Sequence, residues 1–137
     1  MSLNFLLVFQ MVQKKLLLNL YKDMKYTIDA SGKSLGRLAS EVAALLNAKN
    51  SVTFVKNKVA DIQVLVTNAS KVKVTGNKMK ESVHKSYSGY PGGLKEMPLS
   101  YVVSKKGFGE LIVHSVKGML PKNKLQDVRM KNLSIEE

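Results

Sequence analysis

The sequence predicts an α/β protein in which helices pack on a small, mostly parallel sheet. A strand pattern, an amphipathic-helix pattern and a second strand pattern follow one another between residues 25 and 66, the order of a right-handed β–α–β crossover. Further helical stripes and a short strand pattern follow after residue 98. The chain has 137 residues and no cysteine, so we expect one domain whose core forms without disulfides or thiolate metal sites.

The crossover lies in the first part of this domain. Lys25–Asp29 is rich in β-branched and aromatic residues, which favours a strand. Ser34 is a suitable N-cap for a helix whose apolar residues recur at positions 35, 38, 39, 42, 45 and 46. Ile62–Val66 is almost continuously apolar, which predicts a central strand covered on both faces.

A further strand is predicted over residues 71–74, where Val72 and Val74 alternate with lysines. The segment 75–78 then forms a turn, because it is rich in residues that tolerate positive φ.

The remaining elements follow Pro98. Residues 99–106 make two helical turns that Gly107 stops, and a second helical stripe from Leu111 to Leu120 ends at Gly118 and Pro121. We expect a helix over 123–129 and a last edge strand over 133–135.

The charge of the chain favours a polyanionic partner. The formal net charge is +12, and only Arg37 and Arg129 among the 22 basic residues are arginines. Lysine binds phosphates well but reads base edges poorly, so we expect contacts to a nucleic-acid backbone rather than sequence-specific reading of a duplex. An anionic membrane surface would also suit this charge, but no long basic amphipathic helix is present after the first segment.

The clearest binding segment runs from Lys71 to Lys95, with six lysines against one acid. Between residues 79 and 93 the apolar residues are few, so we predict a long loop rather than a packed element. A charge run alone is more typical of a solvated loop. The interspersed rings of His84, Tyr87 and Tyr90, with glycines that allow close approach, favour RNA with exposed bases or sugars.

A second basic segment runs from Lys117 to Lys131, with five basic residues against one acid. A helix end followed by Gly118 and Pro121 is a common structural feature, but it does not explain why charge concentrates there.

The catalytic signals are weak. Gly32-Lys33-Ser34 lies between a strand and a helix, but position 27 is Thr where a P-loop needs its first glycine. What we predict here instead is a site for a single phosphate, formed by a helix N-terminus with Lys33 and Arg37 nearby. His114 has apolar neighbours and is predicted to be a packed structural histidine. We expect no catalytic residues, metal, cofactor or small-molecule substrate.

The segment 1–24 differs from the domain that we expect over 25–137. Its apolar clusters are too short for a membrane span, which needs about 18 residues, and its lysines follow the first cluster, unlike those of a signal peptide. Three interpretations stay open: a true start at Met24, an accessory helix, or an organelle presequence. A membrane anchor or partner-binding module over residues 1–21 is an alternative function.

Four motifs occur in order and resemble one known family: DASGK with SLGRLAS, VTGNK, SGYPGG and VKGMLPKN. Over about Tyr26 to Leu133 the chain resembles the bacterial type of the large-subunit ribosomal protein L-thirteen. The resemblance implies a three-layer α/β/α domain with a four-stranded parallel sheet. It also implies binding to large-subunit ribosomal RNA beside other large-subunit proteins, an early role in subunit assembly, and no enzymatic activity.

The resemblance and the charge pattern together give an expected RNA-binding set: Lys33, Arg37, Lys71, Lys73, Lys78, His84, Lys85, Tyr87, Gly89, Tyr90, Gly92, Gly93, Lys117, Gly118, Lys122 and Lys124. The expected location is the ribosome, in the cytoplasm or alternatively in an organelle. The chain departs from the family pattern at Leu125-Gln126-Asp127, where the family has Leu-Gly-Arg, and at Asn50-Ser51-Val52, which replaces a more basic run. The rival function is a nucleotide- or phosphate-binding enzyme at Gly32–Arg37.

Overall fold

The computed structural model of the chain describes residues 24–52 and 54–137. The segment before Met24, and with it the three interpretations of that segment, lies outside these residues. The elements in chain order are β1 (Met24–Asp29), α2 (Leu35–Leu46), β2 (Ile62–Thr67), the 3₁₀ turn η1 (Ala69–Lys71), α3 (Lys78–Glu81), β3 (Val83–Tyr87), β4 (Leu94–Pro98), α4 (Leu99–Met119), α5 (Gln126–Met130) and β5 (Leu133–Ile135).

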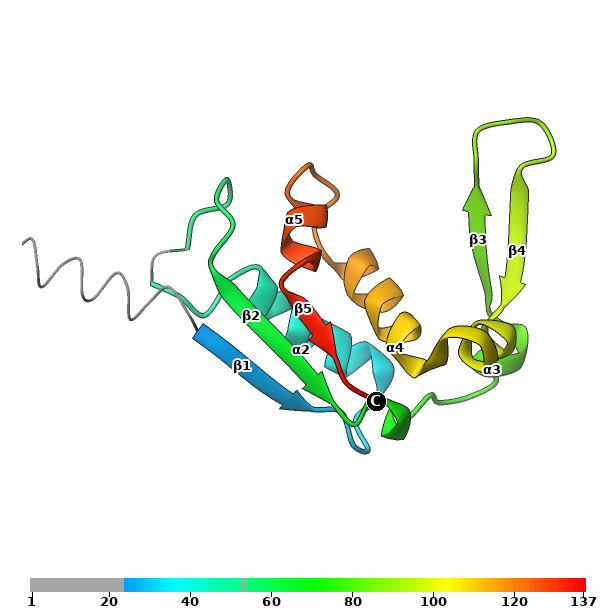
Figure 1. Cartoon of the computed structure of the whole chain (residues 1–137), viewed down its shortest axis with the longest axis horizontal. Helices are drawn as coiled ribbons and strands as arrows, with labels where there is room; N and C mark the ends of the chain where they lie inside the picture. The colour runs from blue at the N-terminus through cyan, green and yellow to red at the C-terminus, as the bar shows by residue number, and fades with distance from the viewer. Residues whose placement is uncertain (1–23, 53) are drawn as a thin grey trace, which may run out of the picture.

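The predicted α/β class and the parallel crossover are confirmed (Figure 1). Strands β1 and β2 pair in parallel from Met24 opposite Ile62 to Asp29 opposite Thr67, with α2 between them in the chain. Strand β5 pairs in parallel with the other edge of β2, as the prediction of a last edge strand required. The sheet therefore has three strands in the order β1-β2-β5, rather than the four that the resemblance implied.

The strand predicted over 71–74 is wrong. Only a single bridge, between Ser34 and Lys73, forms there. The backbone of this segment instead braces the turn before α2: Gly32 N donates to Lys71 O at 3.1 Å, and Lys73 N donates to Lys33 O at 2.9 Å. Because these groups are already bonded to the turn, they are not available to a neighbouring strand.

One face of the sheet forms the core. Ile62, Val64 and Val66 of β2 are buried, whereas Gln63 is exposed, so the expectation that both faces of β2 are covered is wrong for the described residues. Helices α2 and α4 pack on the buried face through apolar side chains that include Leu38, Val42, Ile112 and Val116. The described residues thus form two layers, and a third layer of helices is not among them.

The long loop predicted between residues 79 and 93 is also wrong in its conformation. After the short α3, strands β3 and β4 form an antiparallel hairpin, with Val83 opposite Pro98 and Tyr87 opposite Leu94. Cross-strand pairs such as Lys85–Glu96, joined at 2.9 Å, stabilise it without a core of its own. Figure 1 shows the hairpin projecting away from the sheet, beyond the first turns of α4.

Several element ends agree with the sequence patterns. The predicted stop at Gly107 is a break inside α4, where the backbone has φ 79° and ψ 178°. Helix α4 then ends at Met119, one residue past the predicted Gly118, and α5 is shorter than the expected 123–129. Ser34 is the N-cap of α2 as predicted, but its side chain makes no capping hydrogen bond.

The break in α4 yields a stability prediction. Gly107 has a backbone conformation that is almost exclusive to glycine, and an added Cβ would meet the carboxylate of Glu137. We expect Gly107→Ala to lower the free energy of unfolding, measured by urea denaturation, by about 1–3 kcal/mol.

The matched control is Gly109→Ala, in the same helix. Its Cβ would lie 3.5 Å from Ile135 Cγ2, an ordinary contact, and the added methyl favours a helix. This variant should be neutral or more stable than the wild type. Equal losses in the two variants would contradict the role assigned to the break.

Candidate nucleic-acid interface

The first group of basic residues surrounds the turn between β1 and α2. Asp29, the last residue of β1, accepts hydrogen bonds from Ser31 N at 3.0 Å, Ser31 Oγ at 2.8 Å and Asn68 Nδ2 at 3.1 Å. The backbone N–H of Ser31, followed by these two side chains, lowers the pKa of the Asp29 carboxyl below its ordinary value. The carboxylate thus ties the turn to the segment that follows β2.

This bracing brings Lys33, Arg37, Lys71 and Lys73 to the carboxyl end of the sheet, but their charges are not equally free. Lys33 Nζ pairs with Glu41 Oε2 at 2.8 Å, and Lys71 Nζ donates to Asn68 Oδ1 at 3.4 Å. Within residues 24–52 and 54–137, Arg37 and Lys73 have no side-chain hydrogen bond or ion pair. These two are the side chains of the group that are open to an anion.

The same turn does not have the features of a nucleotide-binding loop. Gly32 N and Leu35 N donate to the carbonyl oxygens of Lys71 and Lys73, at 3.1 and 3.2 Å. A P-loop uses backbone N–H groups of this kind to hold phosphates, so amides that are bonded within the protein argue against a phosphate cradle here.

The second group lies at the end of α4, around an open hollow of about 630 Å³. Its lining residues come from α4, from the segment after it and from α5: His114, Lys117, Gly118, Lys122, Asn123, Lys124 and Gln126.

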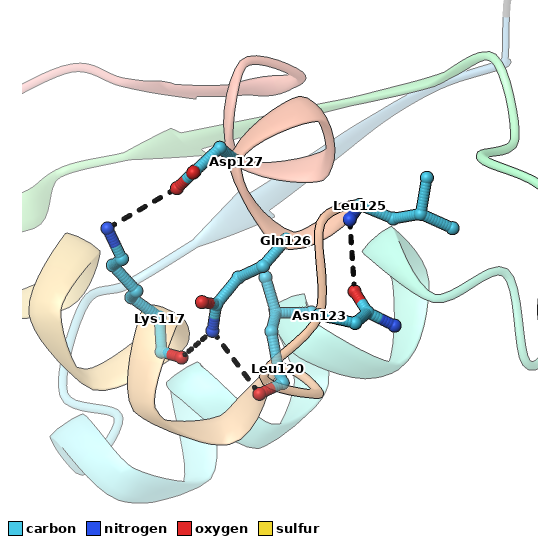
Figure 2. Close-up of polar contacts among 6 residues, drawn as sticks. All are labelled: Lys117, Leu120, Asn123, Leu125, Gln126 and Asp127. Carbon is cyan, nitrogen blue, oxygen red and sulfur yellow. Dashed lines mark hydrogen bonds and ion pairs between the residues drawn. The ribbon is translucent and has the colours of Figure 1, made fainter.

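Polar side chains fix the shape of this hollow (Figure 2). Gln126 Nε2 donates to the carbonyl oxygens of Lys117, at 2.6 Å, and Leu120, at 3.4 Å, and so satisfies acceptors at the end of α4. Asn123 Oδ1 accepts from Leu125 N at 3.2 Å. Sequence reasoning did not assign Asn123 or Gln126 to the site, and the only signal was their position beside VKGMLPKN.

An acidic side chain lies at the edge of the hollow. Asp127 Oδ1 is 3.4 Å from Lys117 Nζ, and both side chains are more than half exposed. In Figure 2 the two side chains reach toward one another from α5 and α4. The resemblance implies Arg at this position, whereas Asp127 places a carboxylate beside Lys117 that would compete with an external anion for it.

The third group belongs to α3 and the hairpin. Tyr87 and Tyr90 are 65% and 76% exposed, so both rings are open to a partner. Gly89 and Gly92 have positive φ, and a Cβ on Gly93 would collide with the Ser88 side chain, so the hairpin tip requires all three glycines. Lys85 is paired with Glu96, whereas Lys78 is unpaired within the described part of the chain.

The two histidines lie against one another and join the hairpin to α4. Their ring centroids are 3.9 Å apart and the planes differ by 26°, so His114 stacks on one face of the His84 ring. His114 was predicted to be a packed structural histidine: it does pack, against His84, but it is exposed and also lines the hollow. Burial, and then the nearby His114, lower the pKa of His84, while Glu110 opposes this shift.

The stacked pair predicts a pH-dependent stability. The pKa of folded His84 lies below the ordinary 6.5, so the unfolded chain binds the proton more readily. The stability contributed by neutral His84 is present above pH 6.5 and is lost as the pH falls below it. We expect the free energy of unfolding, measured by urea denaturation, to decrease from about pH 7 to about pH 5.

His84→Phe is the diagnostic variant, because it keeps an aromatic ring against His114 and cannot titrate. Its unfolding free energy should depend less on pH than that of the wild type. An unchanged slope would show that other groups cause the dependence.

The acid at the hollow yields a binding prediction. Asp127→Asn removes the carboxylate that neutralises Lys117, so affinity for a structured RNA should rise, by up to about fivefold for an exposed pair of this kind. The gain should disappear at about 1 M salt, where the screening length is about 3 Å. Asp61→Asn removes an equal charge that has no lysine partner among residues 24–52 and 54–137, and it should change affinity less. A larger gain in that control would contradict the competition.

Two further classes of site find no support in the described residues. They contain no group of three or more His, Asp or Glu side chains able to hold a metal ion. No helix among them is both long enough and apolar enough to cross a membrane.

Comparisons with known proteins agree with the resemblance. The sequence model of the family described as "Ribosomal protein L13" matches residues 23–136. The "Large ribosomal subunit protein uL13" of Chlamydia muridarum (strain MoPn / Nigg) is 44% identical over 110 residues, which cover 80% of this chain and 73% of that protein. The protein of the same name from Thermoanaerobacter sp. (strain X514) is also 44% identical over 110 residues, covering 80% of this chain and 76% of its own.

Proposed function

The chain belongs to the ribosomal protein L13 family, and on that premise we propose that it binds large-subunit ribosomal RNA and supports early assembly of that subunit. The family consists of ribosomal proteins, which are structural rather than enzymatic. The chain is therefore a large-subunit ribosomal protein, and the rival enzyme at Gly32–Arg37 is wrong. The membrane or partner module suggested for residues 1–21 lies outside the described residues.

The observation that carries the RNA proposal is the basic hollow at the end of α4. Four of its seven lining residues are lysines or histidine, and hydrogen bonds of Gln126 and Asn123 fix the loop that borders it. Flexible lysines around a preformed concave surface suit the phosphates of a folded RNA. In this proposal Lys117, Lys122 and Lys124 neutralise phosphates, and Gly118 allows the backbone of the RNA to approach the helix end.

The other two groups extend this contact. Arg37 and Lys73 supply cations that have no partner in the described part of the chain, with Lys33 and Lys71 beside them. Lys78 and Lys85 supply charge near the hairpin. Tyr87 and Tyr90 stack on exposed bases or riboses, because their rings are open and the hairpin projects from the body (Figure 1). The glycines at positions 89, 92 and 93 give the tip its shape. We assign His84 to holding the hairpin against α4, since His114 covers one face of its ring.

The proposal predicts a specific salt dependence. When the logarithm of the binding constant of the wild-type protein for large-subunit RNA is plotted against the logarithm of the salt concentration, it should fall with a slope whose magnitude is roughly 0.7–0.9 per phosphate contact. Lys122→Gln/Lys124→Gln should make that slope shallower by roughly 1.4–1.8, because two contacts are lost. Filter binding across a salt series measures both quantities.

Two controls make the test decisive. Lys25→Gln/Lys105→Gln removes the same charge from exposed positions outside the three groups and should leave the slope nearly unchanged. In the host cell, the protein should co-sediment with the large subunit at moderate salt, and its neighbours there should be other large-subunit proteins. A slope near zero, or free protein at the top of the gradient, would refute the proposal.

A further inference from the structure

A buried arginine connects two segments that are far apart in the sequence. Arg129 of α5 is 3% exposed, and it is the one charged or polar residue that is buried within residues 24–52 and 54–137. Its Nη2 donates to the carbonyl oxygens of Lys56, at 3.3 Å, and Lys58, at 3.5 Å. Just beyond α5, Asn132 Nδ2 donates to Ala60 O at 3.4 Å. The end of the chain thus holds the connection between α2 and β2.

Burying the guanidinium of Arg129 in this way would be energetically unfavourable if the side chain only filled space. No acidic side chain of the described residues pairs with Arg129, and its Nε has no hydrogen-bond partner. Burying a cation is unfavourable unless dipoles or counter-charges compensate, and here two backbone carbonyls supply the compensation. An apolar side chain would fill the same site without that penalty. What the guanidinium adds is a fixed position for the backbone at Lys56 and Lys58.

The segment that it fixes is a compact exposed turn. Lys58 N donates to Val55 O at 3.3 Å, and Phe54 N donates to Ser51 O at 3.3 Å, so the segment is folded on itself. The side chains of Lys56 and Lys58 are exposed, and Phe54 is 39% exposed although it is a large apolar ring. From Lys49 to Lys58 there are three lysines and no acid. The sequence pattern indicated only that Asn50-Ser51-Val52 replaces a more basic run, and no binding residue was predicted in this segment.

We propose that residues 54–58 form a fourth RNA contact, in which Lys56 and Lys58 bind phosphates and Phe54 packs on a base or ribose, and that Arg129 is its positioning residue. The inference rests on the proposed function, because it adds a contact to the same RNA. Two lysines spaced two residues apart can bind phosphates of an RNA backbone, and the exposed ring beside them can stack on a base or ribose. These features fit RNA better than they fit a partner protein with an apolar surface. Arg129 itself does not touch the RNA, because its side chain is buried.

The test is a double-mutant cycle in the full-length protein, with large-subunit ribosomal RNA as the probe. Lys56→Gln/Lys58→Gln should weaken binding by roughly tenfold or more at about 0.1 M salt, because two phosphate contacts are lost. Arg129→Met should weaken binding to a similar degree. Added to the Lys56→Gln/Lys58→Gln background, it should cause little further loss, since the contacts that it positions are already gone.

Limited trypsin digestion gives a second readout. Trypsin cleaves after Lys56 and Lys58, and the native turn should be protected while Arg129 holds its carbonyls. Arg129→Lys keeps the charge and most of the stem, but its ammonium lies one bond short of the position of Nη2, the atom that donates to both carbonyls. Trypsin should therefore cleave this variant faster at these two bonds, and the variant should bind RNA more weakly. Arg129→Lys also serves as the test variant if Arg129→Met does not fold. Lys25→Gln/Lys105→Gln is the charge-matched control for RNA binding.

The outcomes separate the two proposals. If the wild type binds RNA but Lys56→Gln/Lys58→Gln binds as tightly as the charge-matched control, the fourth contact is refuted. If the losses from Arg129→Met and the lysine pair add in full, Arg129 acts on the fold as a whole and its positioning role is refuted. If the wild type itself does not bind the RNA, the proposed function fails, and this inference fails with it.

Discussion

The parallel pairing of β1 with β2 determines where the basic residues lie. Because the two strands run in the same direction, the turn that begins at Asp29 and the segment that follows Thr67 leave the sheet at the same edge. Hydrogen bonds then join them, from the Asp29–Asn68 contact to the bridge between Ser34 and Lys73. The crossover also puts α2 on the core face, against which α4 packs. The hollow at the end of α4 and the basic turn therefore depend on the same three-stranded scaffold.

Elements whose signal is local could be predicted from the sequence, and elements that depend on a distant partner could not. The apolar spacing of α2 and the β-branched run of β2 identify them without knowledge of the rest of the fold. Val72 and Val74 show an equally regular alternation, but the backbone around them is bonded to the turn before α2. The hairpin was missed for the opposite reason: its sequence is poor in strand formers, and pairs such as Lys85–Glu96 stabilise it across the two strands.

The candidate interface shows the same division. Lysine and glycine clusters in the sequence indicated where a polyanion would bind, because surface charge is mostly exposed whatever the fold. The stack of His84 on His114 and the burial of Arg129 depend on tertiary packing, so the spacing of residues along the sequence could not predict them. One signal was available. Arg129 is one of only two arginines among 22 basic residues, which sets it apart from the lysines used for surface charge.

The projecting hairpin has a consequence for the protein before it reaches its partner. Within the described residues β3 and β4 pair only with each other, so each strand has an outer edge of unpaired N–H and C=O groups. Such edges are templates on which a second copy can add a strand and begin to aggregate. Lys85 lies on β3, but its charge is balanced by Glu96 across the hairpin. Lys95 is exposed on β4, and its charge opposes the approach of a second cationic copy to this edge. An exposed lysine is one of the devices by which short edge strands avoid pairing with other copies.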